Sequence, residues 1–326
     1  MKAIRQFTYG PPGESLVYKT DVERPSVKAG HVLVKVRAAS LNSLDWRLAL
    51  AEPSIIKMST GLRKPSKAEV GADFAGEVVE VGAGVTGVKV GDKVFGETRG
   101  SFAQYCLAPE KTLAIVPDSL TMEEAAALPV AGATALKMIR DHGSVTEGTK
   151  VAVVGAGGGV GSFAVQIAKA LGATVTAVTS TAKVAAARAM GADAVVDYKT
   201  DDVCKGSEVF DVVMDAGAYR SPTDYVPVLT PRTGTYLMVG GSTSNMFGVM
   251  LGGWWSFGVR HGLTAKAGEV TSTHDLLSDL ATLADEGKLR PVIDRTISLD
   301  QVPDAVQDLK DGKCTGKIVV KIDHEE

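Results

Sequence analysis

The sequence predicts an α/β protein that combines a small β-barrel domain with a doubly wound parallel-sheet domain. Three observations predict it. Short valine-rich runs broken by glycines fill the first third of the chain, as in Gly76–Val94, and frequent short strands of this kind favour a small barrel. After Thr121, apolar runs alternate with helical patterns, which is typical of a parallel sheet covered on both faces. A glycine-rich loop at residues 155–161 joins one such run to an amphipathic helix.

The overall composition limits the kinds of partner. The chain has 326 residues, and its 35 basic and 38 acidic side chains give a net charge of −3, so there is no broad basic field for nucleic acid. No apolar run reaches the ~18 residues of a membrane span, and no signal-peptide core is evident. We therefore expect a cytoplasmic protein. Its widely spaced cysteines, Cys106, Cys204 and Cys314, do not suit a disulfide framework.

Several elements of the β-rich first third can be placed. Val32–Val36 alternates apolar and polar residues, which predicts a half-buried strand. Leu48–Glu69 is polar and basic without a clear period, and we expect a loop near a pocket. Thr121 followed by Glu124 is a capping-box pattern that predicts a helix start.

The rest of the chain alternates between strands and helices. Five short apolar runs predict buried parallel strands, and they are Val151–Gly155, Thr174–Val178, Asp193–Asp197, Phe210–Asp215 and Thr235–Gly240. A helix from about Asp275, a strand at Ile293–Ser298, another helix and a final strand at Gly316–Ile322 follow. We expect this last part to return to the first domain.

The strongest motif is the glycine loop. A strand ends at Gly155, and a helix begins near Val160 with apolar residues at helical spacing on one face;. Phosphates approach backbone N–H groups at such a helix start only where no Cβ obstructs them. The spacing is G-x-x-G-x-x-G, and we expect the whole loop to bind a dinucleotide through Gly155, Gly157, Gly158, Gly159, Val160 and Gly161. The alternative is a tight turn without a ligand.

The residues at the end of the second strand of this unit indicate whether NAD or NADPH binds. A carboxylate at its end would bind the ribose 2′-hydroxyl of NAD, but the strand runs into Ser180 and Lys183 without an acid. A hydroxyl and an ammonium group suit a 2′-phosphate, so we expect NADPH. The alternative is that Lys183 is a solvated helix residue.

The motifs together resemble the medium-chain dehydrogenase/reductase superfamily, and within it the zinc-free NADPH:quinone oxidoreductases related to zeta-crystallin. The resemblance covers nearly the whole chain through Leu41–Trp46, Gly71–Gly96, Gly100–Cys106, Leu128–Ala135, Gly155–Gly161, Gly191–Tyr198 and Glu286–Asp294. It implies a GroES-like domain made of residues 1–125 and 265–326, a Rossmann domain at 126–264 and a homodimer. It also implies NADPH between the two domains.

The resemblance also bears on metal binding. The zinc alcohol dehydrogenases share this fold, but Asn42 stands at their cysteine-ligand position and Ala72 at their histidine-ligand position. Neither residue is a suitable zinc ligand, and the clustered cysteines of the structural zinc lobe are absent from the sequence. We therefore expect a zinc-independent enzyme, and a zinc alcohol dehydrogenase is the disfavoured alternative.

The implied chemistry is hydride transfer to a quinone or an α,β-unsaturated carbonyl, with the small apolar substrate as the partner. Negative charge then develops on an oxygen, and a nearby hydrogen-bond donor lowers the barrier. Asn42 is the candidate donor, with Asp45, Trp46 and Thr134 as the other candidate catalytic residues. Trp46 stands where relatives often carry a tyrosine. The alternatives are that Asn42 and Asp45 only fix a turn, and that Thr134 is only a helix residue.

Tyr198 and Lys317 match cofactor-side positions of the family, and Gly240 ends a strand at the edge of the sheet where the nicotinamide would lie. Tyr198 is equally consistent with a surface aromatic residue. The pair Trp254–Trp255 is consistent with a pocket wall, a subunit contact or simple core packing. A different function also stays open, because a protein of this fold can bind NADPH in a structural or regulatory role with little turnover.

Overall fold

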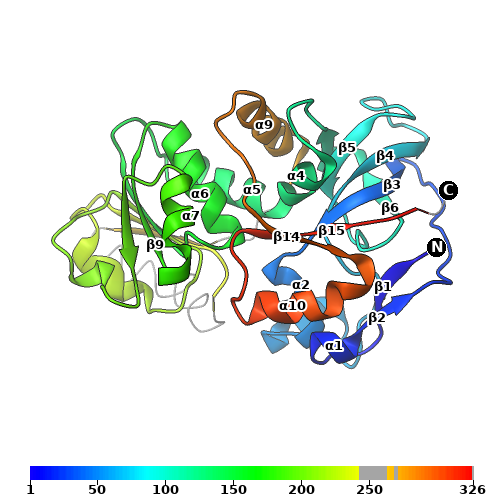
Figure 1. Ribbon diagram of the computed structural model, residues 1–326, viewed down its shortest axis with the longest axis horizontal. Helices are drawn as coiled ribbons and strands as arrows, with labels where there is room; N and C mark the ends of the chain where they lie inside the picture. The colour runs from blue at the N-terminus through cyan, green and yellow to red at the C-terminus, as the bar shows by residue number, and fades with distance from the viewer. Residues whose placement is uncertain (242–262, 268–270, 325–326) are drawn as a thin grey trace. The chain divides into compact units, whose positions relative to one another are not determined.

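The computed structural model describes residues 1–241, 263–267 and 271–324. The chain divides into two compact units, and both chain ends belong to the first (Figure 1). Unit 1 comprises Met1–Ala133 and Thr271–Glu326, and unit 2 comprises Thr134–Val270. The domain boundaries expected at 125/126 and 264/265 stay a prediction.

Unit 1 is built on a seven-stranded sheet in which the last strand of the chain lies beside an early one. The pairing path runs β14-β15-β3-β4-β5-β7, and β6 also pairs with β3. Val32, Val34 and Val36 of β3 are fully buried, but Leu33 between them is buried too, so the strand is more enclosed than the predicted half-buried strand. The strands are β3 (His31–Ser40), β4 (Asp73–Val81), β5 (Lys93–Glu97), β6 (Tyr105–Pro109), β7 (Leu113–Ile115), β14 (Ile293–Ser298) and β15 (Lys317–Lys321), with a separate pair β1 (Ala3–Gln6) and β2 (Leu16–Lys19).

The helices of unit 1 are short and pack around this sheet. They are α1 (Pro12–Ser15), α2 (Ser43–Leu50), α3 (Lys57–Thr60), α4 (Met122–Ala127), α9 (His274–Asp285) and α10 (Val302–Lys310), and α5 (Pro129–Leu136) leads into unit 2. Helix α10 packs against α1 and α2 (Figure 1). The predicted capping box is confirmed, since Glu124 N donates to Thr121 Oγ1 at 3.2 Å and Thr121 N donates to Glu124 Oε2 at 3.0 Å.

The first part of the segment Leu48–Glu69 is helical rather than the loop that its composition predicts, and residues 61–68 form a loop without helix or strand. Helix α2 continues to Leu50, and a 3₁₀ turn at Ser54–Ile56 leads directly into α3. The Tyr9 hydroxyl stabilises this short helix, because it lies 2.7 Å from Thr60 Oγ1 and donates to Gly61 O at 2.8 Å. Contacts from the N-terminal segment thus order a stretch that has no periodic pattern of its own.

Unit 2 contains the predicted parallel sheet. The six strands within the described residues follow the order β10-β9-β8-β11-β12-β13, and every pairing among them is parallel. The strands are β8 (Lys150–Val154), β9 (Thr174–Thr179), β10 (Ala194–Asp197), β11 (Val212–Asp215), β12 (Thr235–Met238) and β13 (Thr264–Ala267). The helices include α6 (Gly159–Ala170) and α7 (Val184–Ala189), whose positions near β9 are visible in Figure 1. This arrangement confirms the predicted α/β class.

The strand order reverses between β8 and β11. From β8 the chain moves outward to β9 and β10, and it then returns to place β11 on the other side of β8. In open parallel sheets, ligands bind outside the carboxyl ends of the strands at such a switch point. None of the helices in the described ranges has the length and apolar character needed to cross a membrane.

Candidate active site

The glycine loop lies at the switch point of unit 2, directly after β8. Gly155 has a φ of +78°, which favours glycine. Gly155 N and Ala156 N both donate to Val178 O of β9, at 3.0 and 3.1 Å. Gly158 is the N-cap of α6, so the N–H groups of the first helical turn have no preceding carbonyl within the helix. A helix N-terminus of this kind favours a phosphate group.

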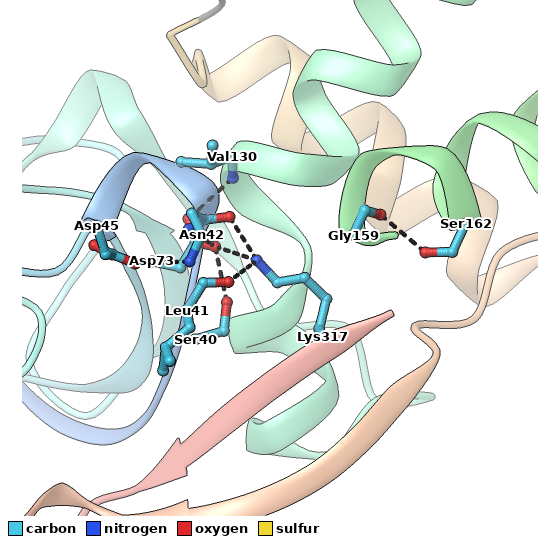
Figure 2. Close-up of polar contacts among 9 residues, drawn as sticks. All are labelled: Ser40, Leu41, Asn42, Asp45, Asp73, Val130, Gly159, Ser162 and Lys317. Atoms are coloured by element: carbon cyan, nitrogen blue, oxygen red, sulfur yellow. Dashed lines mark hydrogen bonds and ion pairs between the residues drawn. The ribbon is translucent and has the colours of Figure 1, made fainter. Parts of the chain in front are cut away.

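Side chains would clash at two glycines of the loop, Gly157 and Gly161, and would be crowded and strained at Gly155, whose φ is positive. A Cβ at Gly161 would collide with the carbonyl oxygen of Gly155. One at Gly157 would lie 2.6 Å from Lys183 Cδ and 2.7 Å from Thr179 Oγ1, and one at Gly155 would lie 3.2 Å from Gly217 N. The sequence therefore needs glycine at these positions to bring the loop against α6, β9 and the end of β11. Gly159 accepts a hydrogen bond from Ser162 Oγ at 2.8 Å, as Figure 2 shows.

The structure brings Lys183 beside this loop. Ser180 follows β9 and is the N-cap of a short 3₁₀ turn, Thr181–Lys183. The half-buried Lys183 side chain packs along Gly157. An ammonium group next to a helix N-terminus adds positive charge where a phosphorylated ligand would bind.

An acidic residue that the sequence analysis did not identify, Asp197, lies near the end of β9. Asp197 ends the neighbouring strand β10, and hydrogen bonds from Thr181 lower the pKa of its carboxyl group. Its Oδ1 atom also accepts a hydrogen bond from Lys199 N at 3.0 Å. The pairing of β9 with β10 would have revealed this neighbour, since Asp197 lies opposite Thr179.

The remaining residues predicted in this unit occupy different environments. Tyr198 is half exposed, with Lys199 Nζ 5.3 Å from its ring centroid. Gly240 follows β12 with a φ of +73°. Thr134 is buried within α5, and the tryptophan pair Trp254–Trp255 lies outside the described residues. The cofactor and catalytic roles of these residues stay predictions.

A buried polar cluster occupies the sheet of unit 1, where four segments meet (Figure 2). Ser40 ends β3, Asn42 precedes α2, Asp73 begins β4 and Lys317 begins β15. The antiparallel pairing places Ser40 opposite Asp73 and also opposite Val319. Strand register therefore brings together side chains that lie far apart in the sequence. The exposed fractions of Asp73 and Lys317 are only 0% and 2%.

Hydrogen bonds join these groups into one network (Figure 2). Asp73 Oδ2 accepts from Ser40 Oγ at 2.8 Å and from Asn42 Nδ2 at 2.8 Å, and it pairs with Lys317 Nζ at 3.2 Å. Asp73 Oδ1 accepts from Val130 N at 3.0 Å. Lys317 Nζ also donates to Asn42 Oδ1 at 2.6 Å and to Leu41 O at 2.8 Å. A buried charge pair of this kind is tolerated because each charged group is hydrogen-bonded.

Asp45 lies at the edge of this network. Its Oδ2 atom accepts from Asn42 N at 2.7 Å, which helps to fix the start of α2. Burial raises the pKa of Asp45 to about 7, and the nearby Asp73 adds to this shift while Lys317 opposes it. Trp46 packs partly buried against the core of unit 1, with the Arg47 guanidinium 4.6 Å from its ring centroid.

The structure thus places Asn42, Asp45 and Lys317 together and adds two residues that sequence reasoning missed, Ser40 and Asp73. The signal for Asp73 was available, because it directly follows the Gly71–Ala72 pair within the family motif. Its importance depends on register, however, which no local pattern reveals. Across the part of the chain that the structure describes, no group of three or more His, Cys, Asp or Glu side chains is placed to hold a metal ion.

Comparisons with known proteins agree with this architecture. Residues 28–118 match the alcohol dehydrogenase GroES-like domain, and residues 190–320 match a family described as zinc-binding dehydrogenase. The tomato (Solanum lycopersicum) 2-methylene-furan-3-one reductase is 33% identical over 98% of this chain and 79% of its own length. The human mitochondrial NAD(P)H oxidoreductase RTN4IP1 is 31% identical over 89% of this chain and 81% of its own length.

A solved structure is similar to this chain over both units. The quinone oxidoreductase from Coxiella burnetii has a TM-score of 0.86 and 30% identity, with 99% of each chain covered. The GroES-like and Rossmann-type architecture expected from the sequence is confirmed. The chain therefore belongs to the medium-chain dehydrogenase/reductase superfamily, in its quinone oxidoreductase-like family.

Proposed function

We propose that this protein is an NADPH-dependent oxidoreductase that reduces a quinone or an α,β-unsaturated carbonyl without zinc. The observation that carries the proposal is the glycine loop at the switch point, with Lys183 packed beside Gly157. The relatives are named for reactions of this kind, a furanone reductase, a quinone oxidoreductase and an NAD(P)H oxidoreductase. The names agree in reaction class but differ in substrate.

The residues of unit 2 fit a dinucleotide. The first turn of α6 offers N–H groups for the pyrophosphate, and the glycines leave the approach clear;. Ser180 and Lys183 favour a 2′-phosphate, because no acid ends β9. Asp197 opposes this preference by its charge, but its carboxylate already accepts hydrogen bonds from Thr181 and from Lys199 N. We therefore propose NADPH over NADH.

When bound, NADPH supplies the hydride, and the chain's own residues supply polarity and position. Reduction of a carbonyl-conjugated carbon leaves negative charge on the carbonyl oxygen. Asn42 is the proposed donor to that oxygen, since a preorganised N–H aimed at developing charge lowers the barrier. Neither Asn42 nor Ala72 suits zinc;, so the amide takes the part that a metal ion takes in zinc-dependent relatives.

A spectrophotometric panel tests this proposal. Purified protein is mixed with NADPH or NADH and with a quinone, a short enone, an alkenal or a simple aldehyde, with and without a chelator. We expect chelator-resistant NADPH oxidation with the quinone or the enone. Chelator-sensitive reduction of the aldehyde would contradict the zinc-free mechanism, and tight NADPH binding without turnover of any acceptor would favour a binding role instead.

A further inference from the structure

We propose that Asp73 is a positioning residue that, together with Lys317, fixes the side-chain amide of Asn42 in one orientation and so presents one amide N–H to the substrate oxygen. The proposal rests on the proposed function only for the role of that N–H. The orientation itself follows from contacts within unit 1. Asp73 is thereby given a part in the reaction although we do not expect it to touch the substrate.

The two ends of the Asn42 amide meet partners of opposite character. Oδ1 lies 2.6 Å from the ammonium nitrogen of Lys317, and Nδ2 lies 2.8 Å from the carboxylate oxygen Oδ2 of Asp73 (Figure 2). If the amide were turned by half a revolution, donor would face donor and acceptor would face acceptor. Lysine has only donors and an ionised aspartate only acceptors, so the ion pair selects one orientation.

A count of donors shows which group is left for a ligand. Lys317 has three N–H protons, and they match its three acceptors, Leu41 O, Asn42 Oδ1 and Asp73 Oδ2. Ser40 gives its single hydroxyl proton to Asp73. Asn42 Nδ2 has two protons and gives one to Asp73. Asn42 therefore keeps one donor after the internal contacts of these three side chains are satisfied.

Burial makes this arrangement rigid. Asp73 is 0% exposed, and its second oxygen accepts from Val130 N at 3.0 Å, so the carboxylate is fixed from both sides. Ser40 and Lys317 are equally enclosed. A donor held in place before the reaction needs no reorganisation when charge develops.

The first test observes the amide directly and needs no turnover. The chain has only two asparagines, Asn42 and Asn245, so protein labelled with [¹⁵N]asparagine gives two side-chain amide signals, and Asn42→Ala assigns them. We expect the Asn42 amide protons to be shifted away from those of an exposed amide and to exchange slowly with solvent. Asp73→Ala, which adds no third asparagine, should move them toward exposed values and accelerate the exchange. An Asn42 signal that Asp73→Ala leaves unchanged would overturn the proposal, even for a protein that reduces none of the tested acceptors.

The second test asks whether Asp73 acts through Asn42. Loss of one such donor lowers kcat by about 10²–10³-fold, and we expect Asn42→Ala to fall in this range with the KM for NADPH little changed. Asp73→Asn should lower kcat in the wild-type chain but by less than about 2-fold in the Asn42→Ala background, because coupled sites are not additive. If Asp73→Asn lowered kcat by the same factor in the wild-type chain and in the Asn42→Ala variant, the proposal would be overturned.

Two further variants separate positioning from stability. Asp73→Asn combined with Lys317→Met removes both buried charges and serves as the folded form if Asp73→Asn alone does not fold. We expect this pair to recover the thermal stability but not kcat, since the amide still lacks its two partners. Recovery of kcat with stability would overturn the proposal. Glu80→Gln breaks the exposed ion pair with Arg24 and is the matched surface control.

Discussion

Removing either charge of the Asp73–Lys317 pair should destabilise the protein far more than removing a surface ion pair. The two groups are 3.2 Å apart, with side-chain exposed fractions of 0% and 2%. Breaking such a buried pair costs about 3–5 kcal/mol because the remaining charge stays buried without its partner. Breaking the pair of Arg24 and Glu80, whose side chains are 44% and 47% exposed, should cost about 0–1 kcal/mol.

The contacts around the pair indicate whether Lys317→Met or Asp73→Asn lowers the free energy of unfolding more. After Lys317→Met, the Asp73 carboxylate still accepts from Ser40, Asn42 and Val130 N, so we expect a loss near the lower end, about 3 kcal/mol. After Asp73→Asn, the ammonium group keeps only two neutral acceptors, and we expect about 5 kcal/mol.

The assay is urea unfolding of the single variants, of the double variant and of Glu80→Gln. With both charges gone, the double variant should return close to the wild-type free energy of unfolding, because a buried pair contributes little net stability. A loss below about 1 kcal/mol for Asp73→Asn, which is the range of exposed pairs, would refute the reasoning. So would a double variant as unstable as the sum of the two single variants.

Three further predictions concern other parts of the molecule. Gly161→Ala should weaken NADPH binding by at least about 10-fold, equivalent to ~1.4 kcal/mol, because its Cβ would collide with Gly155 O. The control is Gly206→Ala, where the nearest atom to the added Cβ would be 3.5 Å away. Equal NADPH affinity of the two variants, measured by calorimetry, would contradict the loop geometry. Lys183→Ala should raise the KM for NADPH more than that for NADH, and a parallel change in both would show that Lys183 does not contact the 2′-phosphate. Burial raises the pKa of Asp45 from 3.8 to about 7, so the folded state holds a proton that the unfolded state has lost, and stability should fall as the pH rises between these values. Asp45→Asn should remove that part of the pH dependence, and a variant with the same slope as wild type would contradict the assignment.

Local sequence patterns predicted all described strands of the parallel sheet in unit 2 except β13, and one helix start in unit 1. The glycine loop, the five apolar runs and the capping box at Thr121 each depend on neighbours within a few residues, so their physical causes are visible in the sequence. The positions of β8 and α6 around Gly155 follow from this local logic.

The buried cluster shows what local patterns could not predict. Asp73 and Lys317 lie 244 residues apart, and only the register of β15 on β3 and of β3 on β4 brings them to one place. Local patterns missed Asp197 for the same reason, because only the pairing of β10 with β9 brings it next to the end of β9. The helical turns within Leu48–Glu69 were missed for a related reason, because distant contacts such as Tyr9 with Thr60 help to order them.

Isotope transfer from the cofactor shows whether the protein moves a hydride from NADPH to a conjugated carbon. NADPH carrying deuterium at the transferable position of the nicotinamide is incubated with the protein and a short enone, and the product is analysed by mass spectrometry and NMR. We expect one deuterium per product molecule, on the carbon β to the carbonyl, with or without a chelator. Product without deuterium, deuterium only on the carbinol carbon, or transfer that a chelator abolishes would contradict this expectation.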